Sequence, residues 1–79
     1  MQVQVKIFAV AREAVGTGQI EVELPAGATV QTLIDTLFQT YPELSPMRLK
    51  FAVNAVYATP DAQLHDGDQV ACIPPVGGG

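Results

Sequence analysis

The sequence has little of what most catalytic, membrane or nucleic-acid-binding proteins need. It contains one cysteine, and four Lys and Arg residues stand against eight Asp and Glu, a net charge of −4. A lone cysteine cannot form a disulfide within the chain, so we expect a cytoplasmic protein. Nucleic-acid binding is disfavoured because it requires a dense basic surface. No apolar run approaches the roughly 20 residues that span a bilayer, and residues 1–6 lack the pattern of a secretory signal, so no membrane contact is expected.

Residues of conventional active sites are equally scarce. The chain has one histidine, His65, and one serine, Ser45. His65, Asp66 and Asp68 could in principle hold a metal, but Asp-Gly-Asp is ordinary turn chemistry, and we expect no metal site. Cys72 shares the alternation phase of Val70, which predicts a buried core thiol in preference to a nucleophile. The chain is therefore not expected to be an enzyme or to bind a cofactor.

What is present is apolar. At 79 residues the chain is long enough for one domain, and 48% of it is hydrophobic while 15% is charged, with a mean hydropathy of +0.25. This composition excludes a disordered chain. It also suggests that part of the apolar surface meets a partner protein.

Apolar and polar residues alternate with the two-residue period of strands over 2–9 and again over 19–24, two segments joined as a hairpin across residues 12–18. Thr29 is expected to cap a helix at its N-terminus, because residues 30–41 show the spacing of one amphipathic helix. Further strands are expected over 49–54, 56–57 and 69–73. The order predicts an α+β domain of the β-grasp (ubiquitin-like) type. In this arrangement one helix covers a mixed sheet of four to five strands, and the first and last strands lie side by side in its middle.

The composition near the C-terminus predicts two parts, a domain over residues 1–75 and a flexible glycine tail over residues 76–79. The tail is Val76-Gly77-Gly78-Gly79, and Pro74-Pro75 holds the chain extended before it. One interpretation of this segment is an unstructured chain end without a function. The alternative is a peptide without side chains at its last three positions, which can thread a narrow cleft and deliver the Gly79 carboxylate to a partner's active site. Adenylation would make that carboxylate an electrophile.

A docking surface is predicted beside the tail. Phe8 and Ile73 are out of phase with the buried positions of their strands, so they should share the sheet face that the helix does not cover. Tyr57 can extend this patch, and Arg12 is suited to a charged rim. Scattered exposed apolar residues, and an Arg12 with no partner, are the alternatives.

Several segments together resemble the small-subunit family of molybdopterin synthase, the MoaD-type sulfur carriers. The similarity covers the whole chain and rests on the β-grasp order and on residues 8–13, 53–54, 64–71 and 74–79. The di-glycine end is shared with ubiquitin-like proteins and other carriers, whereas Asp-Gly-Asp, a strand and then Pro-Pro-Val-x-Gly-Gly are more specific.

The resemblance implies a function for the tail. In this family an ATP-dependent activating enzyme related to ubiquitin activators adenylates the terminal carboxylate, here Gly79, which becomes a thiocarboxylate. The large synthase subunit, expected in a heterotetramer, receives the tail and uses its sulfur to build the dithiolene of molybdopterin from a cyclic pyranopterin monophosphate. The catalytic residues then belong to these partners, and the carrier binds no cofactor itself. The family's partner-facing positions fall on Phe8, Tyr57 and Ile73, and its motif arginine on Arg12.

The sequence departs from the family pattern at two places. Cys72-Ile73 stands where the family usually has aromatics, and Gly77 where Ala, Ser or Thr is common. Sulfur carriers for thiamine or tRNA thiolation, and ubiquitin-like modifiers, therefore remain as alternatives.

Overall fold

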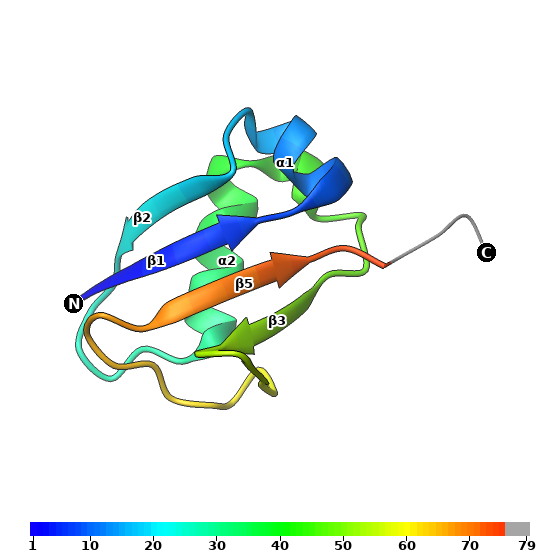
Figure 1. Cartoon of the computed structure of the whole chain (residues 1–79). Helices are drawn as coiled ribbons and strands as arrows, with labels where there is room; N and C mark the ends of the chain where they lie inside the picture. The colour runs from blue at the N-terminus through cyan, green and yellow to red at the C-terminus, as the bar shows by residue number, and fades with distance from the viewer. Residues whose placement is uncertain (76–79) are drawn as a thin grey trace.

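The alternation of apolar residues near both ends of the chain creates the centre of the sheet. In the computed structural model, which describes residues 1–75, β1 (Gln2–Ile7) lies parallel to β5 (Gln69–Ile73), with Val5 beside Val70 and Ile7 beside Cys72. The two strands run side by side in front of the long helix (Figure 1). The predicted central pairing of the first and last strands is confirmed.

Three further strands complete the sheet within the described residues, in the order β2-β1-β5-β3-β4. β2 (Gln19–Glu23) is antiparallel to β1, and β3 (Lys50–Val53) is antiparallel to both β5 and β4 (Val56–Tyr57). The mixed sheet, the α+β class and the β-grasp fold are confirmed.

The amphipathic helix covers one face of this sheet. α2 (Val30–Thr40) begins at Thr29, whose hydroxyl accepts a hydrogen bond from the Thr32 amide while the Thr32 hydroxyl accepts one from the Thr29 amide. This reciprocal pair is a capping box, which satisfies two amides at the start of the helix. α2 buries Val30, Leu33 and Leu37, and a 3-10 turn (Pro42–Leu44) follows it. The rest of the core comes mainly from alternate positions of the strands, namely Val3, Val5, Ile7, Val22, Phe51, Val70 and Cys72.

The structure corrects the sequence analysis between the first two strands. β1 ends at Ile7 instead of residue 9, and residues expected in an irregular hairpin connection form a short second helix, α1 (Ala9–Val15). Ala9 has a positive φ of 53°, which turns the chain sharply out of the strand, and Ala11 is buried against the core. Ala9 fits the strand alternation as well as a helix, and this ambiguity concealed the helix start.

Across residues 1–75, no helix has the length and apolar character that crossing a membrane requires.

Candidate functional site

The described chain ends at the edge of the sheet toward which both central strands point. β5 finishes at Ile73, Pro74 is buried and Pro75 is exposed. α1 lies at this same end of the molecule, beyond the end of β1 (Figure 1). Four of the predicted site residues, Val76, Gly77, Gly78 and Gly79, lie outside the described residues. The site described here is therefore the surface from which they continue.

Phe8 and Ile73 meet at this end on the face that α2 does not cover. They are the next residues after the paired Ile7 and Cys72, and the Phe8 amide donates a hydrogen bond to the Cys72 carbonyl at 3.3 Å. Phe8 keeps an extended backbone, with φ −117° and ψ 155°, so its side chain continues the alternation of β1. Phe8 is 46% exposed and Ile73 is half-buried. The alternation thus places both side chains as the sequence predicted.

Strand register extends this pair into two rows of side chains across the sheet. One row consists of Phe8, Ile73 and Lys50, and the next of Lys6, Ala71, Ala52 and Tyr57. We call these residues the tail-end face. The two alanines form a flat floor between larger side chains, because a methyl group projects little from the sheet.

Tyr57 lies at the border of the tail-end face, on the edge strand β4. It is 69% exposed, and the Lys50 Nζ atom lies 5.8 Å from the centroid of its ring. At that distance the ammonium is attracted by the electrons of the ring. The structure brings Tyr57 onto the same face as Ile73, two alanines away from Lys6.

Arg12 reaches the tail-end face from α1. Its amide donates a hydrogen bond to the Phe8 carbonyl at 3.3 Å, in the first turn after the sharp bend at Ala9. Its side chain lies against Gly18, where a Cβ atom would come within 3.2 Å of the Arg12 Nε. A shallow hollow is lined by Lys6, Phe8 and Arg12 among others. All four predicted surface residues therefore border one face.

The sequence analysis missed two features of this surface. Val10 is 52% exposed at the start of α1, directly after the bend that follows Phe8. Lys50 stands level with Ile73. The helix-forming run Ala9-Val10-Ala11-Arg12-Glu13 was the available signal for Val10, and the phase of Lys50 relative to the buried Phe51 was the signal for Lys50.

Two other candidates have structural roles elsewhere. Cys72 is fully buried, and burial raises the pKa of its thiol to about 11, so it packs as a core side chain. The Asp66 carboxylate accepts a hydrogen bond from the Gln2 amide at 2.8 Å, and Asp68 accepts from the His65 amide at 2.8 Å and from the Asn54 side chain at 3.0 Å. These carboxylates fix the turn before β5. Within residues 1–75, no three His, Cys, Asp or Glu side chains are grouped so as to hold a metal.

Comparison with known proteins gives the same assignment along nearly the whole chain. Residues 5–79 match the ThiS family. The molybdopterin synthase sulfur carrier subunit of Mycobacterium tuberculosis is 43% identical over 82 residues, covering all of this chain and 99% of that protein. The protein of the same name from Arabidopsis thaliana is 35% identical, covering all of this chain and 84% of the relative.

Solved structures agree. A Pyrococcus furiosus protein assigned as molybdopterin converting factor, subunit 1, superposes with a TM-score of 0.91 at 34% identity, covering 96% of this chain and 99% of its own. SAMP1 from Haloferax volcanii gives 0.89 at 26% identity over the full length of both chains. The Amycolatopsis orientalis BexX/CysO complex gives 0.71 at 28% identity, covering 98% of this chain and 99% of that chain.

Proposed function

Since the chain belongs to the ThiS family and, within it, to the molybdopterin synthase sulfur carrier subunits, we propose that its cargo is a sulfur atom on the carboxyl carbon of Gly79. The observation that supports this most strongly is the position of the tail-end face. An exposed pair of apolar residues, Phe8 and Ile73, lies at the sheet end from which residues 76–79 continue. A partner that covers this face is placed to receive the tail.

The proposed chemistry begins with the Gly79 carboxylate. An activating enzyme transfers AMP from ATP to a carboxylate oxygen, and pyrophosphate leaves. A sulfur nucleophile then attacks the carboxyl carbon of this acyl-adenylate and displaces AMP, because AMP is a far better leaving group than the oxygen of a free carboxylate. The product is a thiocarboxylate, and the carrier itself binds no cofactor in this scheme.

The second partner is the large subunit of molybdopterin synthase, in a heterotetramer. We propose that it covers the tail-end face, with Phe8, Tyr57 and Ile73 in contact and Arg12 at the rim. The tail extends through residues 76–78 into its active site, where the sulfur is transferred to a cyclic pyranopterin monophosphate and the Gly79 carboxylate is regenerated. The catalytic residues belong to the large subunit and the activating enzyme.

The proposed compartment is the cytoplasm, where thiols are kept reduced, because the one cysteine, Cys72, is a free and buried thiol.

A second candidate function is protein modification. The similarity to SAMP1, the small archaeal modifier protein 1 of Haloferax volcanii, favours it, since a modifier needs the same activated tail. In that case the acyl-adenylate ends in an isopeptide bond to a lysine of another protein. A carrier for thiamine synthesis or tRNA thiolation would form the same thiocarboxylate but pass its sulfur to a different acceptor.

Paired substitutions in the tail test the threading model. Gly78→Ala adds one methyl at a position proposed to lie inside a closed channel, where close-packed walls relax only in part and a cost of about 1 to 3 kcal/mol is expected. Gly77→Ala is the matched control, at a position nearer the channel mouth where little loss is expected. The measurement is synthase turnover, and affinity for the large subunit, with the thiocarboxylated form of each variant. Equal tolerance at both positions would contradict threading.

A further inference from the structure

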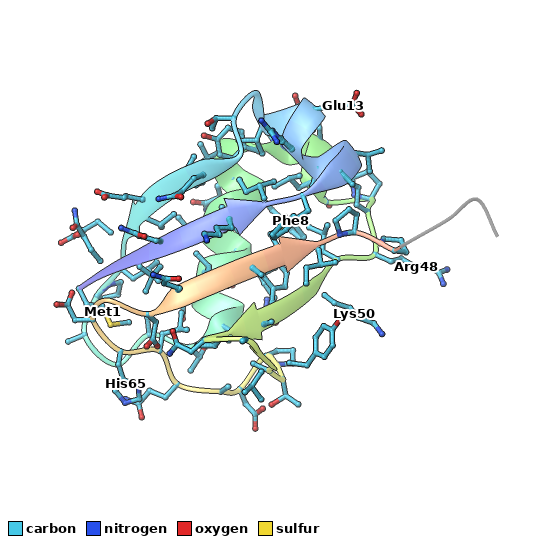
Figure 2. All side chains as sticks on the ribbon, viewed as in Figure 1. Met1, Phe8, Glu13, Arg48, Lys50 and His65 are labelled. Atoms are coloured by element: carbon cyan, nitrogen blue, oxygen red, sulfur yellow. The ribbon has the colours of Figure 1, made fainter. Side chains whose placement is uncertain are left out.

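All four basic residues of the chain gather at one end of the molecule. Lys6 and Lys50 stand on the tail-end face itself, Lys50 beside Ile73 and Lys6 two residues before Phe8 on the same strand, and both are exposed. Arg12 borders the same hollow as Lys6 and Phe8. Arg48 is exposed two residues before Lys50, and both lie near the end of the described chain (Figure 2).

The carboxylates of the sheet lie outside the tail-end face, toward the other end of the strands. Glu23 stands beside Gln2 at the start of β1, and Glu21 stands beside Gln4 near its middle. Asp66 accepts a hydrogen bond from the Gln2 amide, and Asp68 precedes β5 directly. The remaining four, Glu13, Asp35, Glu43 and Asp61, are on the helices and a loop. Glu13 follows Arg12 on α1, and Figure 2 shows it away from Lys50 and Arg48. No described carboxylate belongs to the rows that form the tail-end face.

This separation has a consequence for association. A chain with a net charge of −4 is repelled as a whole by an acidic partner, so a cluster of all its cations around one apolar patch selects the orientation in which the chain approaches. Charges at the rim of an interface act mainly on the association rate, whereas buried apolar contacts act on dissociation. The Lys50 ammonium is also held over the Tyr57 ring, which keeps it at the border of the face.

We infer that the tail-end face docks onto a protein surface with carboxylates arranged around an apolar pocket, and that Lys6, Arg12, Arg48 and Lys50 steer this association. The inference rests on the proposed function, because it describes the surface of the large subunit that receives the tail. Phe8 and Ile73 form the apolar centre of the docking surface on this chain, and the four cations surround that centre.

The test is the association rate of the full-length chain with the large subunit of the molybdopterin synthase from the same organism, measured by stopped flow from low to high salt. We expect the rate to fall steadily as salt increases, because ions screen exposed charges. Lys50→Gln should lower the low-salt rate about threefold and flatten the salt dependence, with little change in dissociation. Lys50→Arg should restore the rate, since it keeps the charge.

Gln39→Glu provides the matched control. It changes the net charge by the same single unit, but on the exposed surface of α2. Its rate should stay close to that of the unchanged protein, and circular dichroism should show all variants folded. Equal effects of Lys50→Gln and Gln39→Glu, or a rate independent of salt, would overturn steering while leaving the carrier function intact. Failure of the unchanged protein to bind at any salt concentration would overturn the proposed function, and with it this inference.

Discussion

Cys72 shows how burial can suppress the chemistry of a reactive residue. Its thiol is fully buried between the sheet and α2, and its pKa is raised to about 11 because desolvation disfavours the thiolate. Its neighbour in the sequence, Ile73, points to the opposite face, beside Phe8. One step along β5 therefore separates a core residue from an interface residue.

The raised thiol pKa predicts a stability change at alkaline pH. Above pH 9 the unfolded chain loses the Cys72 proton while the folded chain keeps it, so the folded state binds more protons. The free energy of unfolding should thus fall as pH rises from 9 to 11, by up to about 2 kcal/mol from this group. Denaturant unfolding at successive pH values measures it. Cys72→Ala is the control, and an identical pH dependence in that variant would show that the thiol is not responsible.

Phe8 tests the assignment of the apolar centre. Phe8→Asp should weaken binding to the large subunit by about 2 kcal/mol or more, because the carboxylate must lose its water when the partner covers it. The free domain should lose little stability, since Phe8 is already half exposed.

Val56→Asp is the matched control for Phe8→Asp. Val56 is 68% exposed, and its partner Val53 is out of phase with Ala52, so Val56 is on the side opposite Tyr57. Calorimetric titration of each variant with the large subunit should show a large loss only for Phe8. Unfolding of isolated Phe8→Asp would instead place Phe8 in the core.

At the scale of elements, the periodicity of apolar residues predicted the helix and the strands that pack one side against the core. The helix face from Val30 to Tyr41 and the alternation of β1, β2 and β5 each have one buried side, and burial gives them a detectable period. The short helix α1 was missed because only Ala11 within it is buried, so tertiary contacts rather than periodicity decide its conformation. The same reason explains why Val10 was missed as a surface residue.

The hairpin between β3 and β4 has a turn that its sequence fits poorly. Asn54 and Ala55 both have positive φ, 49° and 72°, as a two-residue type I′ turn requires. A β-carbon in this conformation costs about 1 kcal/mol, and glycine avoids that cost.

Ala55→Gly should therefore stabilise the domain by up to about 1 kcal/mol, and raise the melting temperature by roughly 4–8 °C for a domain of this size. Thermal unfolding by circular dichroism measures the change. Ala26→Gly, in a turn where the alanine has no positive φ, should destabilise slightly, since glycine adds freedom to the unfolded chain. A loss of stability in Ala55→Gly would contradict the turn geometry.

For the whole molecule, the proposed function separates a folded domain from a reactive end. The core is built from residues between Val3 and Cys72, so a change at Gly79 removes no described apolar contact. The sequence predicted the fold and the shared sheet face of Phe8 and Ile73, because both depend on alternation and on the order of the elements. The clustering of cations could not be predicted in this way, because it depends on which residues of distant segments become neighbours, and strand register decides this for Lys6 and Lys50.

The central claim is that Gly79 carries sulfur, and intact mass tests it most directly. The full-length chain is incubated with its activating enzyme, ATP and a sulfur source, alongside a variant that lacks Gly79 and whose melting temperature should be nearly unchanged. We predict that the full-length chain gains the mass of one sulfur-for-oxygen exchange and that the shortened chain gains none. Larger covalent conjugates with other proteins, or an unchanged mass in the full-length chain, would contradict it.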